Sequence, residues 1–254
     1  MPMFKNKWFL EDELVQELRN KFLDDLPTEK QNYHEDDIKR VKENDFFVAR
    51  YILHNEKDIE KSYNMLTESL KYRKEMEVNT LRKKDLPKEY FDNRAVILCN
   101  KDNRDHPIVA IRCKTHVNNK DTRRQQQQYM LYWVERGLRQ SDWGAVTILF
   151  DCTDSGVSNV DLDMMRFIFS TFNKYVPWGL GYFFVYNMPW YLSALWKVIK
   201  QWVPQRHLEK IKFVDCNSIL EFVDVDQLPI CLGGTSSKLY EPKNGVSRDG
   251  DESE

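Results

Sequence analysis

Residues 181–202, GYFFVYNMPWYLSALWKVIKQW, join a short aromatic run to a second segment that starts at a proline. Residues 182–186 are aromatic or β-branched, which is typical of a buried strand. Pro189 is typical of the first turn of a helix, because the N–H group that proline lacks has no helical partner there. The stretch therefore predicts a buried strand that leads directly into a helix.

The same stretch overlaps a run of 22 residues, 175–196, that has no charged side chain. A run of that length could cross a bilayer as one helix. Pro177, Gly179, Gly181, Asn187 and Pro189 interrupt it, and both proline and glycine disfavour a helix interior. Its many tyrosines and tryptophans prefer the membrane interface to the hydrocarbon centre. We therefore expect no transmembrane helix.

The predicted helix after Pro189 is apolar over more of its surface than one core face requires. At about 100° per residue, its polar positions fall on one narrow face, and apolar groups cover about 200°. An ordinary surface helix has an apolar stripe of roughly 100°. The polar face holds Ser193, Lys197, Lys200 and Gln201; the apolar remainder holds Leu192, Leu195, Trp196, Val198, Ile199, Trp202 and Val203. Deep burial and contact with a membrane interface both explain such a helix.

Strand-like and helical runs alternate on both sides of this stretch. Strands are predicted at 95–99, 107–113, 145–151, 182–186 and 211–214, and helices at 121–139 and 160–175. The short polar connection 101–105 predicts a hairpin between the first two strands. This alternation predicts an α/β fold with helices packed on the sheet.

The first 80 residues are predicted to be helical. Apolar residues recur every three or four positions at 8–26, 35–53 and 59–76. We expect Pro27 to end the first helix and Asp58 to cap the third. Residues 241–254 are polar and acidic and are predicted to be disordered. The chain is thus divided into a helical segment at 1–80, an α/β domain at 81–240 and a tail at 241–254.

Composition and motifs limit the possible functions. The 254 residues can bury a core, and a net charge of −2 gives no general attraction for nucleic acid. Acidic residues near the N-terminus argue against a signal peptide, so a cytoplasmic protein is expected. There is no phosphate-binding loop, GxSxG or HExxH motif, and the five histidines lack the spacing of metal ligands. We expect neither an enzyme nor a bound metal or other cofactor.

The five cysteines are widely spaced and include no CxxC pair, which argues against a zinc ribbon or a disulfide scaffold. Cys152 follows the predicted strand 145–151, where α/β enzymes often carry functional groups. It could be a nucleophile or a small buried residue before a turn, and we favour burial. Cys99 and Cys113 fall in neighbouring predicted strands, where we expect packing residues and no redox pair.

The order of the motifs resembles that of the CRAL-TRIO lipid-binding family. Residues 63–75, YNMLTESLKYRKE, are similar to the helix that precedes the domain, with Tyr72 in place of the usual tryptophan. Residues 150–156, FDCTDSG, resemble the F-D-x-x-G segment of the family. Residues 175–177 and 181–190 resemble its Y-P…N-x-P-W signature, and residues 228–235 resemble its closing L-P-x-x-x-G-G motif. The resemblance spans about residues 36–235.

The resemblance implies a mixed, mostly parallel sheet, covered by helices, that forms the floor of an apolar cavity for one lipid. A mobile gate helix would roof this cavity, and the segment after Pro189 corresponds to that helix. The expected pocket and gate residues are Phe150, Phe169, Phe184, Tyr186, Leu192, Leu195, Trp196 and Ile199. The expected membrane contacts are Trp190, Tyr191, Lys197, Lys200 and Trp202.

The resemblance further implies a non-enzymatic protein that binds a phospholipid or another small lipid and transfers it between membranes. Such a protein is expected to be a cytoplasmic monomer that contacts endomembranes or lipid droplets peripherally and does not bind nucleic acid. The alternative is an interaction module that keeps the fold without transfer and anchors at a membrane or on a partner protein.

The headgroup is less well defined by the resemblance. Phosphatidylinositol-binding members carry a basic pair, a glutamate and a lysine at three sites, where this chain has Asn55-Glu56, Trp178 and Lys210. Only Lys210 matches, and one lysine attracts a phosphate without defining an inositol site. A retinoid, a tocopherol, phosphatidylcholine or another neutral lipid are therefore candidates as well.

Overall fold

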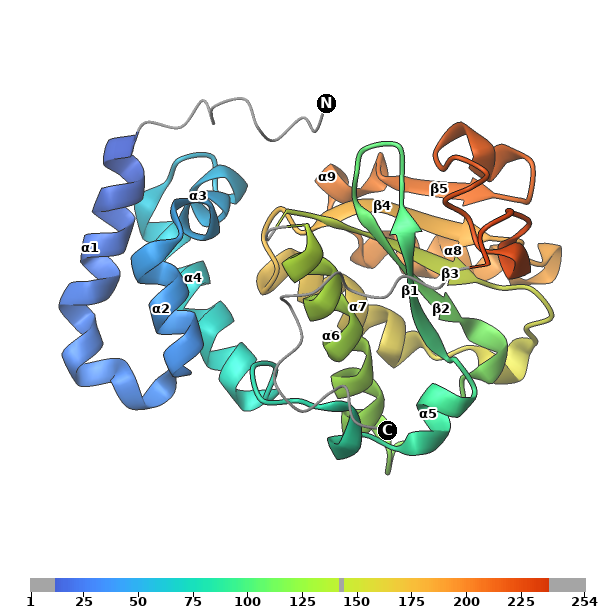
Figure 1. The fold of residues 1–254 in the computed structure, drawn as a ribbon, viewed down its shortest axis with the longest axis horizontal. Coiled ribbons are helices and arrows are strands. Elements are labelled where there is room, and N and C mark those ends of the chain that lie inside the picture. The colour runs from blue at the N-terminus through green and yellow to red at the C-terminus, as the bar shows by residue number, and fades with distance from the viewer. Residues whose placement is uncertain (1–11, 142–143, 238–254) are drawn as a thin grey trace. The chain divides into compact units, whose positions relative to one another are not determined.

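The fold is that of a computed structural model, which describes residues 12–141 and 144–237. The tail expected at 241–254 lies outside these residues. The chain forms two compact units (Figure 1). One contains the residues up to Thr80 together with Ser170–Gly179, and the other contains Leu81–Phe169 and the residues from Leu180 onward. We call them the helical unit and the sheet unit.

The helical unit is built mainly from helices that pack on one another. They are α1 (Asp12–Glu29), α2 (Glu35–Glu43), α3 (Asp45–His54) and α4 (Ile59–Glu75), with a short 3-10 turn, η1 (Lys30–Asn32), after the first. The predicted cap of α4 is confirmed, because the side chain of Asp58 accepts a hydrogen bond from the Lys61 N–H at 2.9 Å.

Two predicted helix boundaries in this unit were wrong. The single helix expected at 35–53 is divided into α2 and α3. Asn44 leaves the helical conformation there, and its side-chain oxygen caps α3 by accepting from the Phe47 N–H at 2.9 Å. Pro27 lies in the last turn of α1 without ending it. Proline lacks a backbone N–H group, so one helical hydrogen bond is lost at Pro27. So close to the end of the helix, that loss does not outweigh the packing of the helix.

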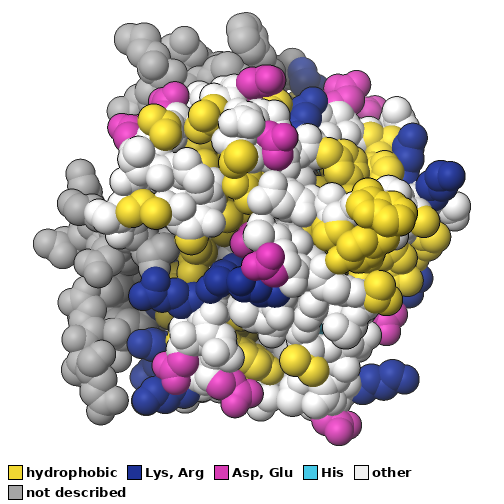
Figure 2. Space-filling view, turned by 90° about the vertical axis from the view of Figure 1, so that its right-hand side faces the viewer, with side chains coloured by type: hydrophobic (Ala, Val, Ile, Leu, Met, Phe, Trp, Pro, Cys, Tyr) yellow, Lys and Arg dark blue, Asp and Glu magenta, His cyan; other side chains and the backbone are white. Residues whose placement is uncertain are grey.

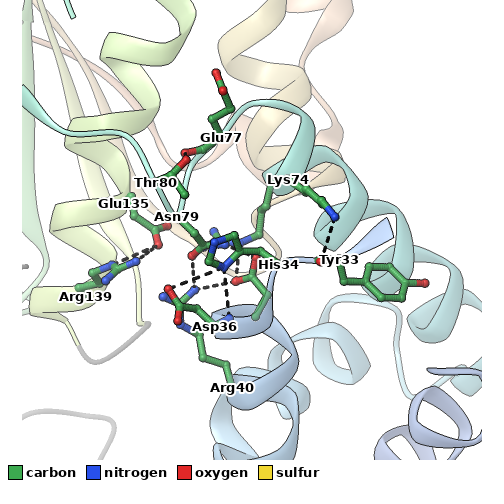
Figure 3. A network of polar contacts seen from close by, with 12 residues as sticks. Tyr33, His34, Asp36, Arg40, Lys74, Glu77, Asn79, Thr80, Glu135 and Arg139 are labelled. Atoms are coloured by element: carbon green, nitrogen blue, oxygen red, sulfur yellow. Dashed lines mark hydrogen bonds and ion pairs between the residues drawn. The ribbon is translucent and has the colours of Figure 1, made fainter. Parts of the chain in front are cut away.

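A buried carboxylate connects α2 with α4 and with the residues that follow α4. The side chain of Asp37 is fully buried, and its Oδ1 accepts from Arg40 Nη1 at 2.6 Å and from Arg73 Nε at 2.9 Å. Its Oδ2 accepts from the side-chain amide of Asn79. The side-chain oxygen of Asn79 in turn accepts from both arginines, at 3.1 and 3.2 Å. Figure 3 shows Arg40 and Asn79 side by side in this network, where the buried charge is paired from several directions.

The sheet unit contains a five-stranded sheet in the order β1-β2-β3-β4-β5. The strands are β1 (Val96–Lys101), β2 (Pro107–Arg112), β3 (Val146–Asp151), β4 (Leu180–Tyr186) and β5 (Ile211–Val214). β1 and β2 form the predicted antiparallel hairpin, whereas β2 to β5 run parallel. The prediction of a mixed, mostly parallel sheet is therefore confirmed.

The two faces of the sheet have different covers. One face packs against Ile219, Val223, Leu228 and Leu232 of the segment that follows β5. The other face carries α6 (Arg123–Gln140). Phe169 of α7 (Leu162–Lys174) stacks on Phe183 of the sheet, and Trp196 of α8 (Ser193–Ile199) contacts Phe213. Gly137 allows α6 to lie close to the sheet, because a Cβ atom there would be 2.7 Å from a methyl group of Val146.

The helix predicted after Pro189 forms as three short helical pieces that follow one another directly. They are the 3-10 turn η5 (Trp190–Leu192), then α8, then the 3-10 turn η6 (Lys200–Trp202). We call residues 190–202 the aromatic segment. Within residues 12–141 and 144–237, no helix has both the length and the apolar character needed to cross a membrane.

Candidate functional site

The sheet unit contains a partly open cavity of about 480 Å³ between the sheet and the helices on one of its faces. This size is within the range of small-molecule binding pockets. The sheet contributes Ile111, Phe150, Phe183, Val185 and Phe213; α6 and α7 contribute Tyr129, Met130, Met164, Met165, Ile168 and Phe169; the aromatic segment contributes Leu192, Leu195, Trp196 and Ile199. Most of this lining is aliphatic or aromatic, so the cavity suits an apolar ligand.

Six of the eight residues expected in the pocket or gate line this cavity: Phe150, Phe169, Leu192, Leu195, Trp196 and Ile199. The rings of Phe150 and Phe169 both stack on Phe183, with centroid distances of 5.4 and 4.9 Å. The ring of Trp196 meets Phe213 edge-on at 5.1 Å. The part that these residues play in binding a ligand stays a prediction.

Phe184 and Tyr186 were expected in the pocket but lie on the opposite face of the sheet. The ring of Phe184 packs against Tyr182 and Phe222 at 5.2 and 5.4 Å. The hydroxyl of Tyr186 donates to the Leu232 carbonyl at 2.9 Å. Successive residues of a strand point to opposite faces, so Phe183 and Val185 face the cavity instead. The sequence is aromatic on both faces of this strand and does not show which one meets the cavity.

The aromatic segment also presents apolar groups to solvent. Trp190 is 85 % exposed, Tyr191 is 46 % exposed and Lys197 and Lys200 are exposed as well. Figure 2 shows hydrophobic side chains gathered into a patch on one face of the molecule. Trp202, also expected at the membrane, is only partly exposed, and the guanidinium group of Arg166 lies 4.4 Å from the centre of its ring. The segment is therefore apolar on its cavity side and on part of its outer side.

Two hydrogen bonds, one from Asn187 and one from the aromatic segment itself, connect this part of the chain to the loop that follows β3. The side-chain amide of Asn187 donates to the Thr153 hydroxyl at 3.0 Å. The Tyr191 hydroxyl donates to the Ser155 carbonyl at 2.8 Å. Asn187 has a φ of 51°, a left-handed conformation that asparagine tolerates better than most residues. The chain thus turns sharply after β4 and is held to the neighbouring loop.

The cavity has a polar border around Asp161, which the sequence reasoning missed. The carboxylate accepts from Arg123 Nη1 at 3.1 Å and from the Met164 N–H at 2.9 Å, and it lies 3.0 Å from Nε2 of His116. Burial opposes ionisation of this carboxyl. The Met164 amide, His116 and Arg123 outweigh that effect and hold the pKa of Asp161 below its usual value. His116 and Arg123 lie about 40 positions away in sequence, so only Asp161 at the start of a predicted helix could have drawn attention to this group.

Lys210, the expected headgroup residue, is not part of the cavity wall. Its Nζ donates to the Leu180 carbonyl at 2.6 Å, at the beginning of β4. Burial and the nearby charges of Arg104 and Arg206 lower the pKa of Lys210. The lysine precedes β5 and is absent from the cavity lining, and its part in binding a headgroup stays a prediction.

His207 in the short helix α9 (Gln205–Leu208) makes the stability of the protein depend on pH. It is 5 % exposed, and neither ring nitrogen has a hydrogen-bond partner among the residues described here. Burial, together with Lys210 and Arg206, lowers its pKa to about 4. The unfolded chain takes up this proton near pH 6.5, before the folded protein does. Stability is therefore lost as the pH falls from about 6.5 to about 4.

We expect this histidine to cost on the order of 3 kcal/mol of unfolding free energy between pH 7 and pH 4. His207→Leu should remove that part of the pH dependence, which urea denaturation at a series of pH values measures. If the difference in unfolding free energy between the variant and the original protein stayed the same at every pH, the assignment to His207 would be contradicted.

The described residues contain no group of three or more histidine, cysteine, aspartate or glutamate side chains arranged to hold a metal ion. Two cysteines of the cavity wall, Cys113 and Cys152, lie next to each other.

Comparison with known proteins gives one matching family and several relatives. The model of the CRAL/TRIO domain matches residues 91–234. The phosphatidylinositol transfer protein CSR1 of Eremothecium gossypii is 26 % identical over 205 residues, which cover 75 % of this chain and 47 % of that protein. The CRAL-TRIO domain-containing protein C3H8.02 of Schizosaccharomyces pombe is 25 % identical over 143 residues, covering 55 % of this chain and 32 % of that protein. The chain therefore spans about half or less of the length of these relatives.

Among solved structures, that of Sfh5 is similar, with a TM-score of 0.64 and 17 % identity over 84 % of each chain. At this level of identity the likeness concerns the fold alone. The family match covers more than half of the 254 residues and includes every strand of the sheet and the cavity-lining helices. This protein belongs to the CRAL/TRIO domain family.

Proposed function

We propose that the protein binds one lipid molecule in the cavity of the sheet unit and carries it between membranes without catalysing a reaction. The observation that carries the proposal is the cavity itself, which has about 480 Å³ of space and a largely apolar lining. Each CH₂ group that a lipid tail buries there contributes about 0.8 kcal/mol. The relative from Eremothecium gossypii is named a phosphatidylinositol transfer protein, which supports a phospholipid as cargo.

The polar border of the cavity is the proposed place of the headgroup. Arg123 and Asp161 form an ion pair at 3.1 Å, so their charges largely cancel. His116 adds a ring nitrogen at the same carboxylate. A border of this kind favours an uncharged or zwitterionic headgroup over a strongly anionic one. We therefore propose a neutral lipid or phosphatidylcholine ahead of phosphatidylinositol.

The aromatic segment is the proposed gate and membrane contact. Opening of a cavity wall onto a bilayer would allow the bound lipid to leave. Exposed tryptophan and tyrosine rings beside lysines are typical of a helix that lies in the membrane interface. Trp190, Tyr191, Lys197 and Lys200 have this arrangement. Trp202 is proposed as a weaker contact because Arg166 covers its ring.

The lipid itself can be identified directly. Native mass spectrometry of the protein purified from cells is expected to show a complex with one lipid, and extraction of that complex should yield its chemical class. The purified protein should also speed the exchange of labelled phosphatidylcholine between liposomes. A protein that carries no lipid and transfers none would contradict the proposal. If it still bound liposomes, the alternative of a membrane-anchoring interaction module would be supported.

Trp190 provides a test of the docking surface. We expect Trp190→Ala to lower the fraction of protein bound to liposomes about tenfold, because inserting a large apolar side chain is worth about 1.5–3 kcal/mol. Trp190→Phe keeps a large ring and should retain most of the binding. Sedimentation with liposomes measures both variants. Equal recruitment of Trp190→Ala and the original protein would show that this ring does not enter the membrane.

The remaining proposals concern organisation and setting. We infer a similarity to the N-terminal domain of motile sperm domain-containing protein 2, carried by Val78-Asn79, by residues 161–167 and by residues 187–190. We also propose residues 81–240 as the lipid-binding domain and residues 1–80 as a helical segment. The proposed setting is a monomer at the cytoplasmic surface of endomembranes or lipid droplets.

A further inference from the structure

Two cysteine side chains meet in the wall of the cavity. Cys113 directly follows β2, and Cys152 directly follows β3. These strands are parallel neighbours, and their last paired residues are Arg112 and Asp151. The two sulfur atoms lie 3.9 Å apart, and both cysteines line the cavity.

The spacing of neighbouring strands is compatible with a disulfide between the residues that follow Arg112 and Asp151. Neighbouring strands of a sheet lie about 4.8 Å apart, and disulfides join Cα atoms that are roughly 4.4–6.8 Å apart. A disulfide has an S–S distance of about 2 Å, so the sulfur atoms must approach each other by about 2 Å. Cys113 begins the 3-10 turn η3 (Cys113–Thr115), beyond the paired part of β2. Rotation of the two side chains can therefore bring the sulfurs together while the strand pairing is kept.

The chemical environment makes the two thiols unequal. Their mutual hydrogen bond lowers the pKa of Cys152, although burial and the neighbouring Asp151 oppose this effect. The same hydrogen bond, together with burial, raises the pKa of Cys113. The thiolate is the reactive form of cysteine, so we assign the first attack to Cys152, which is buried but lines the cavity, and the resolving step to the adjacent Cys113.

The other cysteines differ from this pair. Cys99 is fully buried on the opposite face of the sheet, where burial raises the pKa of its thiol. Cys216 and Cys231 are exposed. Neither Cys216 nor Cys231 lines the cavity.

We propose that Cys113 and Cys152 form a redox-modified site in which a reversible disulfide closes within the cavity wall. The oxidant is a small disulfide of the glutathione class. The Cys152 thiolate attacks one sulfur of the oxidant, so that a mixed disulfide forms and one small thiolate leaves. The Cys113 thiolate then attacks the Cys152 sulfur, closing the protein disulfide and releasing the second small thiolate. Two protein thiols are oxidised, one small disulfide is reduced, and the two protons pass to the released thiolates.

The site has a place in the architecture of the cavity. Cys152 begins the loop whose residues Thr153 and Ser155 hold the aromatic segment. The Ser155 hydroxyl donates to the Cys152 carbonyl at 2.7 Å, so the cysteine and the anchoring loop are joined directly. Closure of the disulfide links the end of β2 to this anchoring loop. The disulfide needs no lipid to form, whereas an effect on lipid exchange rests on the proposed function.

The test uses the full chain with Cys216→Ser and Cys231→Ser, which removes the exposed thiols. After incubation with oxidised glutathione, the mass of the intact protein should fall by about 2 Da, the mass of the two hydrogens lost. Alkylation should then label two fewer cysteines than in the reduced protein, and a digest without reductant should contain one peptide pair that joins Cys113 to Cys152. Reductant should reverse all three changes.

Single substitutions separate the two roles. In the same background, Cys113→Ser should stop at a stable mixed disulfide on Cys152, because the resolving thiol is absent. Cys152→Ser should react at least tenfold more slowly, because it leaves Cys113 as the only thiol of the pair, and burial raises the pKa of that thiol. Far-ultraviolet circular dichroism of each variant checks that it folds, and Cys113→Ala replaces Cys113→Ser if the latter does not. A protein that keeps both thiols in excess oxidised glutathione, or a link that involves Cys99, would overturn the proposal.

Discussion

Asp37→Ala is expected to lower the free energy of unfolding of the helical unit by about 3–5 kcal/mol, the cost of removing one partner from a buried ion pair. Asp37 is fully buried and pairs with Arg40 and Arg73, and Arg73 is itself only 6 % exposed. Without the carboxylate, the buried guanidinium group of Arg73 loses the charge that compensates it. Asn79 also loses the acceptor of its amide hydrogen. Urea denaturation followed by circular dichroism at 222 nm measures the change.

Asp36→Ala is the matched control for this experiment. It removes the same side chain one residue earlier in the same helix, but Asp36 is exposed and its carboxylate lies 3.7 Å from Nδ1 of His34. Its charge near the helix N-terminus is worth about 0.3–1 kcal/mol. A loss at Asp37 no larger than that at Asp36 would show that the buried network does not hold the helices together.

Val185→Trp is expected to weaken lipid binding roughly fiftyfold. Val185 lies in β4 and points into the cavity. An indole ring there would take up space that the lipid tail needs. If the ring keeps about three CH₂ groups of the tail out of the cavity, binding loses about 2.4 kcal/mol, at about 0.8 kcal/mol for each group. A loss of that size raises the dissociation constant roughly fiftyfold. The amount of lipid that copurifies with the protein, and the rate of transfer between liposomes, both measure the effect.

Val225→Trp introduces the same ring at a position outside the cavity lining. Val225 is 46 % exposed, so the added ring extends into solvent, and lipid binding should stay as in the original protein. Thermal unfolding of both variants shows whether the fold is kept. A folded Val185→Trp protein that carries as much lipid as Val225→Trp would refute the assignment of this cavity as the lipid site.

Much of the fold could be predicted from local sequence. The predicted strand at 211–214 matches β5, and the turn at 101–105 correctly indicated an antiparallel hairpin. Such signals depend on residues close together in the chain. The division of residues 35–53 into two helices at Asn44 was missed because the hydrophobic spacing continues across the break. The break is marked only by the side chain of Asn44, which caps the second helix.

The candidate site could be predicted only in part. Leu192, Leu195, Trp196 and Ile199 were assigned from a resemblance and line the cavity. Phe184 was assigned to the wrong face because every residue of its strand is apolar or aromatic apart from Gly181. Lys210 was assigned from a single matching position, and its hydrogen bond to the Leu180 carbonyl joins residues 30 positions apart.

The sequence by itself determined the order and type of the main elements, the hairpin between the first two strands and the break at Pro189 between strand and helix. These follow from periodicity, turn residues and proline chemistry, which act over a few neighbouring residues. Only the tertiary structure decided which face of β4 meets the cavity, that Asp161 pairs with Arg123, and that Cys113 meets Cys152. Those contacts join residues at least 38 positions apart, and they exist only where packing of the sheet and its helices brings the residues together.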